Sequence, residues 1–292
     1  MKIIPRYATL CPCWSKNKAQ QKLSPGDPGA DSKYQEYYQR FAAGDFYLIL
    51  HSLGCARASA DYQSDRWNVA TNNDAIAHAV IDSNDGDVRQ NLEWGMYGWH
   101  VGSKGNKLSL GVEMCESDAI KYDQPKSWQF SILDEEKAKR HCRTTYNSAV
   151  ELFAQLCVMF GLDPMTRILS HKEAWEKGIG SNHGDPEHLW NGLNMGYTMN
   201  GFRADVAAMM PTVAPDTQED ETPAETDMPF PDVPSDAWYA DALRWNVEKG
   251  IIIPTGGNFN PNGNITNATR AVNNRRLFNA LYAALKEELK GK

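Results

Sequence analysis

The chain has 292 residues, of which 41% are hydrophobic and 23% are charged, as is usual for a globular protein with a packed core. Its formal net charge of -7 argues against a protein whose main task is to neutralise phosphate, so we expect no nucleic-acid partner. No apolar run approaches the roughly 18 to 20 residues that a membrane helix requires, so we expect no membrane partner either.

The N-terminus and the cysteines bear on the compartment. The first six residues lack the apolar stretch of a secretory signal, so we expect synthesis in the cytoplasm without a signal peptide. The six cysteines are spread too thinly for a disulfide scaffold, and Cys11 and Cys13 have the wrong spacing for a zinc knuckle. We therefore expect free thiols, several of them buried.

Predicted helices and strands alternate over residues 1–210. Residues 14–33 are polar and rich in Gly and Pro, which predicts a surface loop. In chain order we then expect a helix over 34–43, a strand over 46–50, a helix over 58–67, strands over 77–82 and 108–114, a helix over 134–160, a strand at 168–169 and a helix over 201–210. This order predicts a three-layer α/β domain with a central mixed sheet flanked by helices.

A change in composition follows this domain. Residues 211–228 contain six acidic residues and three prolines but no Lys or Arg. Such a segment cannot bury apolar surface and its like charges repel, so we expect an extended linker. The linker separates a catalytic domain over 1–210 from a small helical module over 229–292.

Three potential metal ligands lie near the ends of predicted strands. His51 directly follows the strand over 46–50, His171 follows Ser170 at the end of a second strand, and Asp185 comes fourteen positions later. Two imidazoles and one carboxylate leave the fourth tetrahedral position open, as in a catalytic zinc site. His51 also suits an ordinary buried histidine. Asp185 before Pro186 also suits a helix N-cap, a role that is compatible with metal binding.

Five motifs occur in an order that indicates a family. They are Leu50-His51-Ser52, Trp99-His100-Val101-Gly102, Leu110-Gly111-Val112-Glu113-Met114, Ser170-His171-Lys172-Glu173 and Asn182-His183-Gly184-Asp185-Pro186. Together they resemble the N-acetylmuramoyl-L-alanine amidase family of phage lysins, autolysins and peptidoglycan recognition proteins. The variant present here is similar to prophage endolysins of Gram-positive gut bacteria. The resemblance covers about residues 1–210.

The resemblance implies the ligands and a catalytic base. His51, His171 and Asp185 match the family's zinc ligands, and Glu113 matches its catalytic glutamate. A carboxylate beside zinc can accept a proton from the attacking water and deliver it to the leaving amine. An ordinary strand residue is the alternative for Glu113.

The resemblance also leaves several roles open. His183 stands where many members carry Lys, so it matches a donor to the oxyanion if its tautomer or charge allows, or it only braces the loop. Ala77 stands where some phage members carry a catalytically important tyrosine. Alanine cannot fill that role, so the catalytic role is expected to fall more on Glu113. Trp99 and His100 are expected to contact substrate, although Trp99 also suits a core position. His78 and His100 also suit packing or hydrogen bonding behind the ligands.

The C-terminal segment resembles a surface-layer homology module over about residues 229–290. The resemblance is carried by Phe230-Pro231-Asp232-Val233-Pro234, Trp238-Tyr239-Ala240, Gly250-Ile251-Ile252 and Ile265-Thr266. It implies binding to secondary cell-wall polymers, but such modules usually act in threes and residues 267–270 depart from the usual run. Pairing with another subunit as a homo-oligomer is the alternative.

The leading hypothesis is a zinc-dependent hydrolase that cleaves the amide between N-acetylmuramic acid and L-alanine in bacterial peptidoglycan. The alternative is a recognition protein that binds peptidoglycan without cutting it. A glycan-cleaving enzyme would need two facing carboxylates, and the sequence offers no persuasive pair. By analogy with phage endolysins, we expect action at the bacterial cell wall after release through a holin-type pore or lysis.

Overall fold

The computed structural model describes residues 1–123 and 128–210. The chain divides into two units, Met1–Val213 and Ala214–Lys292. The predicted linker and the predicted C-terminal module both lie outside the described residues.

The centre of the first unit is a six-stranded mixed sheet. Its strands, in spatial order, are β1 (Ile3–Pro5), β4 (Val88–Gln90), β3 (Ala79–Ile81), β5 (Ser109–Met114), β2 (Tyr47–Ser52) and β8 (Ile168–Ser170). Only the β3–β4 pair is antiparallel. Leu48, Ile49 and Leu50 are all fully buried, because β2 lies inside the sheet and both of its faces are covered.

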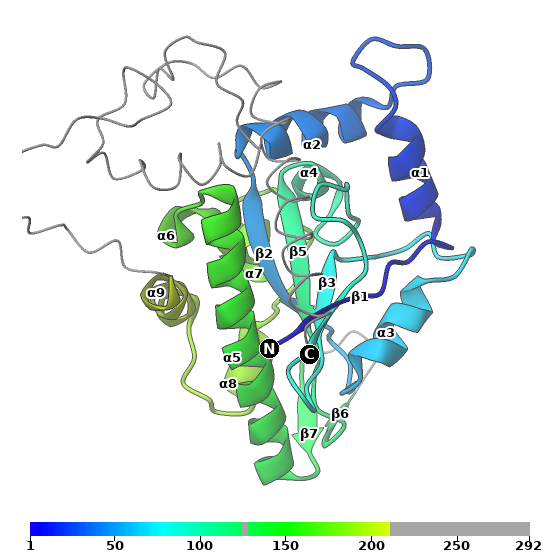
Figure 1. The fold of residues 1–292 in the computed structure, drawn as a ribbon. Coiled ribbons are helices and arrows are strands. Elements are labelled where there is room, and N and C mark those ends of the chain that lie inside the picture. Colours follow the sequence, from blue (N-terminus) through cyan, green and yellow to red (C-terminus); the bar gives the residue numbers. More distant parts are fainter. Residues whose placement is uncertain (124–127, 211–292) are drawn as a thin grey trace, which may run out of the picture. The chain divides into compact units, whose positions relative to one another are not determined.

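Helices cover both faces of the sheet, which confirms the predicted fold class. They are α1 (Pro12–Gln20), α2 (Ser32–Ala43), α3 (Ala60–Trp67), α4 (Ser103–Asn106), α5 (Glu135–Phe160), α6 (Pro164–Arg167), α7 (His171–Glu176), α8 (Glu187–Gly192) and α9 (Met199–Met209). Figure 1 shows α5 with α9 beside it on one side of the sheet, and α3 with α1 on the other.

The longest helix, α5, begins and ends where its capping residues predict. The side chain of Asp134 accepts a hydrogen bond from the backbone of Lys137, which satisfies a free N–H of the first turn. Gly161 ends the helix in the left-handed conformation, with a φ of 63°, which glycine adopts without steric cost.

The loop predicted over 14–33 is wrong in part, because α1 occupies Pro12–Gln20. Cys13 and Asn17 are the buried residues of this helix, and the Asn17 amide donates to the carbonyl oxygens of Cys13 and Tyr97 at 2.9 Å. The buried face of this helix thus carries a thiol and a hydrogen-bonded amide. A search for apolar residues at helical spacing does not detect such a helix. All six cysteines are free and five are buried, as expected.

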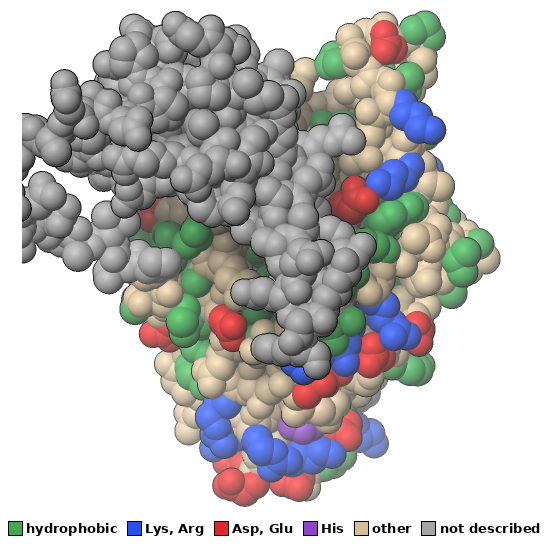
Figure 2. Space-filling view, viewed as in Figure 1, with side chains coloured by type: hydrophobic (Ala, Val, Ile, Leu, Met, Phe, Trp, Pro, Cys, Tyr) green, Lys and Arg blue, Asp and Glu red, His purple; other side chains and the backbone are tan. Residues whose placement is uncertain are grey.

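The surface of the described unit mixes both signs of charge. On the face drawn in Figure 2, Lys and Arg side chains lie next to Asp and Glu at the bottom of the view, where α5 begins in Figure 1. Lys137 pairs with Asp118 at 2.8 Å and Lys139 with Glu135 at 2.6 Å in this region. No helix among the described residues is both long and apolar enough to cross a membrane.

Candidate active site

The site begins at the carboxyl edge of the parallel strands. His51 on β2 lies directly opposite Glu113 on β5 in the register of the two strands. Leu50 lies opposite Ser170 at the end of β8, so His171, the first residue of α7, emerges at the same edge. Ligands bind in open α/β sheets at this edge, because loops that follow different strands meet there.

The three predicted ligands converge. The Nδ1 atom of His51 lies 3.1 Å from Nδ1 of His171 and 3.2 Å from Oδ2 of Asp185, and His171 Nδ1 lies 3.4 Å from Asp185 Oδ1. Ligand atoms about 2.0–2.1 Å from a tetrahedral zinc ion are separated from one another by about 3.3 Å. The three residues are 1%, 4% and 3% exposed. The donor set and its spacing therefore fit a zinc ion with one open position.

Asp185 does not cap a helix, so that part of the sequence prediction is wrong. The helix α8 begins at Glu187 and has no side-chain cap. The Asp185 carboxylate instead faces the two histidines and accepts a hydrogen bond from the backbone N–H of Ser52 at 3.3 Å. Burial alone would raise the pKa of Asp185, but hydrogen bonds from His171 and His51 hold it below its usual range. The residue stays ionised, as a metal ligand requires.

His51 is held from behind by a second histidine. Its Nε2 lies 3.0 Å from Nδ1 of His100, and the Nε2 of His100 lies 3.3 Å from the carbonyl oxygen of Ser109. The backbone of Gly111 passes so close that a Cβ there would overlap the His100 ring. Burial lowers the pKa of His51 to about 4, so its imidazole is neutral and free to bind a metal at neutral pH.

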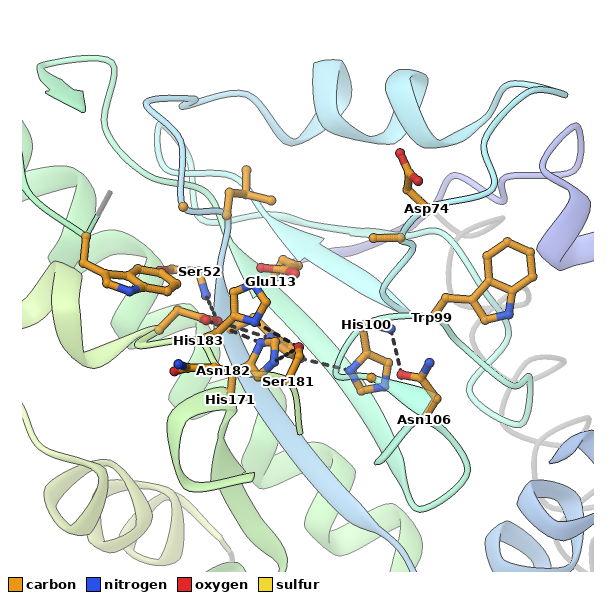
Figure 3. Close-up of a pocket in the computed structure, with 17 residues that line it drawn as sticks. Ser52, Asp74, Trp99, His100, Asn106, Glu113, His171, Ser181, Asn182 and His183 are labelled. Carbon is orange, nitrogen blue, oxygen red and sulfur yellow. Dashed lines mark hydrogen bonds and ion pairs between the residues drawn. The ribbon is translucent and has the colours of Figure 1, made fainter. Parts of the chain in front are cut away.

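Glu113 stands beside the ligands with an unused oxygen. Its Oε2 is buried and has no hydrogen-bond partner within the part of the chain that the structure describes. Burial, followed by the charges of Asp185 and Glu116, raises the pKa of Glu113 well above its ordinary value. Figure 3 places its carboxyl group next to the cluster of histidines. A buried carboxyl oxygen without a partner, next to a fitting metal site, makes Glu113 a candidate for proton transfer.

His183 covers another side of the cluster. Its ring lies 4.3 Å from the ring of His171 and 5.6 Å from that of Trp128, measured between centroids. Its Nδ1 is 2.9 Å from Oγ of Ser181. Burial, followed by the charge of His171, lowers the pKa of His183, so the neutral imidazole is favoured.

A cavity of about 770 Å³ opens over these groups. Trp99 and His100, for which the sequence predicts contact with substrate, line it together with His183 and the three metal-site residues. In Figure 3, Trp99 lies beyond His100 on the side away from His171. His78 does not line this cavity. It is fully buried, lies 2.6 Å from the carbonyl oxygen of Met96, and has a packing role.

The sequence did not single out Trp128 or Glu116. Trp128 is 39% exposed and lines the cavity just before β7 (Phe130–Ile132), which pairs with β6 (Ile120–Tyr122) outside the main sheet. Glu116 is 1% exposed; Gly54 N–H donates to it at 2.9 Å and Tyr122 O–H at 2.7 Å. An aromatic residue in a loop and a second glutamate after a strand carry no distinguishing pattern.

The buried Glu116 predicts a dependence of stability on pH. Burial raises its pKa from 4.5 to about 7, so the folded state holds a proton that the unfolded state has lost between these values. The contribution of Glu116 to the free energy of unfolding is greatest below pH 4.5 and is lost as the pH rises through 7. By pH 8 the loss amounts to about 3 kcal/mol.

We expect Glu116→Gln to remove this slope. The difference in unfolding free energy between pH 5 and pH 8, measured with chelator present, should be smaller in the variant by about 2.5 kcal/mol. The amide can donate to the Tyr122 hydroxyl, which can in turn donate to Nε2 of His188 at 2.7 Å. An unchanged slope would show that Glu116 is ionised in the fold at pH 5.

Comparison with known families agrees with this geometry. Residues 46–188 match the model of the N-acetylmuramoyl-L-alanine amidase family. The chain contains an N-acetylmuramoyl-L-alanine amidase domain. Residues 229–268 match the S-layer homology domain. The protein is therefore a peptidoglycan amidase with a cell-wall module, and recognition without cleavage is not favoured.

Several solved structures resemble the amidase domain. The catalytic domain of XlyA is 21% identical over 56% of this chain and 86% of its own, with a TM-score of 0.37. The Staphylococcus aureus hydrolase AmiA, solved with its ligand, is 14% identical over 65% and 98%, with a TM-score of 0.44. The catalytic domain of PlyG is 18% identical over 74% and 99%, with a TM-score of 0.41. No curated protein matches the chain.

Proposed function

We propose that this amidase uses a zinc ion held by His51, His171 and Asp185 to cleave the bond between N-acetylmuramic acid and L-alanine. The observation that carries the proposal is the spacing of the ligand atoms of His51, His171 and Asp185, at 3.1 to 3.4 Å, next to Oε2 of Glu113, which has no partner among the described residues. Zinc at this position would polarise the amide carbonyl and lower the pKa of the attacking water.

The protein groups divide the remaining work. Glu113 accepts the proton of the attacking water and delivers it to the leaving amine of L-alanine, because its Oε2 has no partner among the described residues. His183 donates a hydrogen bond to the oxyanion that forms on the carbonyl. Trp99 forms a wall of the cleft, and His100 fixes the orientation of His51 as well as lining the cavity.

The reaction is tested by digesting purified peptidoglycan and identifying the ends released. We expect new amino groups of L-alanine, with no new reducing sugar ends, because only the amide is cut. Treatment with a chelator should abolish the release, and added Zn²⁺ should restore it. New reducing ends, or activity that survives complete metal removal, would contradict the proposal.

We propose that the S-layer homology module holds the enzyme on secondary cell-wall polymers. A single module gives little avidity by itself, so its contribution is to raise the local concentration of the amidase at the wall. No comparison supports the homo-oligomer that the sequence left open, and release through a holin-type pore stays a prediction.

Deletion of residues 229–292 tests the module. The truncated enzyme should sediment with purified walls several-fold less than the full chain, while its cleavage of small soluble muropeptides is unchanged. Equal sedimentation of both forms would refute wall targeting. Self-association would be favoured instead if the full chain had the solution mass of an oligomer while the truncated form had the mass of a monomer.

A further inference from the structure

One hydroxyl group joins two histidines of the site. Oγ of Ser181 lies 3.0 Å from Nε2 of His171 and 2.9 Å from Nδ1 of His183. The backbone N–H of Ser181 donates to the carbonyl oxygen of Val101 at 2.9 Å, which fixes the residue in place. Ser181 therefore connects a predicted metal ligand to a residue that faces the cavity.

The hydrogen-bonding capacity of the groups favours one arrangement of the protons, in which the Nε2 proton of His171 and the Ser181 hydroxyl proton each have an acceptor. His171 turns Nδ1 toward His51 and Asp185, and a nitrogen that binds a metal carries no proton. Its proton is then on Nε2 and is donated to Ser181. The serine hydroxyl has a single proton, which remains available for Nδ1 of His183. A neutral His183 that accepts this hydrogen bond must carry its own proton on Nε2.

We propose that Ser181 is a positioning residue that keeps the proton of His183 on Nε2, where the neutral ring can donate to the oxyanion. The inference rests on the proposed function, because it requires a metal at His171 and an oxyanion in the cavity. A neutral imidazole donates from one nitrogen only, so its tautomer decides whether it can donate to the oxyanion. The serine supplies the partner that selects this tautomer.

Ring contacts fix the plane of the His183 imidazole. Its ring is inclined at 32° to that of His171 and at 78° to that of Trp128. A 180° flip within this plane would put a ring carbon in place of Nδ1 beside Ser181, so the hydrogen bond to Ser181 selects between the two orientations.

A double-mutant cycle in the full-length, zinc-loaded enzyme tests the proposal. Ser181→Ala should lower kcat for L-alanine release about fivefold with little change in KM, the cost of one net hydrogen bond. Ser181→Thr keeps the hydroxyl and should restore kcat. In a His183→Ala background, Ser181→Ala should have no further effect on kcat. Ser15→Ala is the control, because its exposed hydroxyl bonds the Pro12 carbonyl away from the cavity.

Two further measurements make the outcome decisive. Zinc affinity, measured by chelator competition, separates any effect of Ser181 that acts through His171. Ring-nitrogen NMR of the zinc-loaded wild type, without substrate, should show the His183 proton on Nε2. The proposal would be overturned if Ser181→Ala lowered kcat equally in the wild-type and His183→Ala backgrounds. It would also be overturned if His183→Ala by itself lost no activity, or if NMR showed the His183 proton on Nδ1.

The result is separable from the test of the proposed function. If the wild-type enzyme released no L-alanine ends, or released them without metal, the assigned reaction would fail. The NMR measurement needs no substrate, so it still decides whether Ser181 sets the position of the His183 proton.

Discussion

Glu113→Gln is expected to abolish most L-alanine release while the protein keeps its fold and its zinc. The amide cannot accept a proton from water, so the loss in kcat should be about 10²- to 10⁴-fold, the usual contribution of a general base. Stability should be unchanged or higher, because the substitution removes a buried carboxyl group whose Oε2 has no partner among the described residues. Zinc content, thermal unfolding and released amino groups measure the three effects.

Glu116→Gln is the matched control for this experiment. Glu113 lies on β5 and Glu116 lies two residues beyond its end, both have raised pKa values caused first by burial, and both are replaced by an amide of the same shape. Glu116 differs because its oxygens accept from Gly54 and Tyr122. We expect its variant to keep activity within a few-fold. The opposite pattern, with Glu116→Gln inactive and Glu113→Gln active, would exchange the two assignments.

Gly111→Ala is expected to lower zinc affinity about 10- to 100-fold, the usual cost of disturbing the partner of a metal ligand. The three heavy atoms closest to an added Cβ all belong to the ring of His100. That ring is fixed between Nε2 of His51 and the carbonyl oxygen of Ser109, so it cannot move aside without losing both contacts. Chelator competition measures the affinity, and release of L-alanine should fall with zinc occupancy.

The double variant tests the cause. His100→Ala alone should also weaken zinc binding, because His51 loses the partner that fixes its orientation. Adding Gly111→Ala to the His100→Ala variant should lower zinc affinity little further, since the ring that would overlap the new methyl group is gone. Gly201→Ala, at a helical glycine in α9 whose added Cβ would meet only the Thr198 hydroxyl, is the control. Fully additive losses would show that Gly111 matters for another reason.

The elements that position the metal site could be predicted from the sequence. The apolar run at 46–50 and the helical spacing over 134–160 each have a strong period, and the structure places β2 at Tyr47–Ser52 and α5 at Glu135–Phe160. His51 and His171 follow strand ends, where parallel strands bring distant residues together. The positions of His51 and His171 at strand ends made a shared site plausible, but the choice of Asp185 as the third ligand depended on the family resemblance.

The remaining features depend on packing that a linear pattern does not contain. The helix α1 buries Cys13 and Asn17, which lack an apolar period. Asp185 before Pro186 has the residue types of a helix start, yet its carboxylate turns to the two histidines, because their ring nitrogens and the backbone N–H of Ser52 offer it hydrogen-bonding partners in the buried site. The proton position on His183 depends on a serine two residues away, and no residue type by itself predicts it.

The separation of the metal-site residues along the chain has a consequence for folding. His51 and His171 are 120 residues apart, and Asp185 lies 134 residues from His51. An ion shared by the three residues closes a long loop, and such cross-links restrict the unfolded chain most when the loop is long. The same ion that activates water would then tie the two ends of the amidase domain together. The enzyme would gain stiffness and activity in a single event, and in zinc-poor surroundings it would lose both at once.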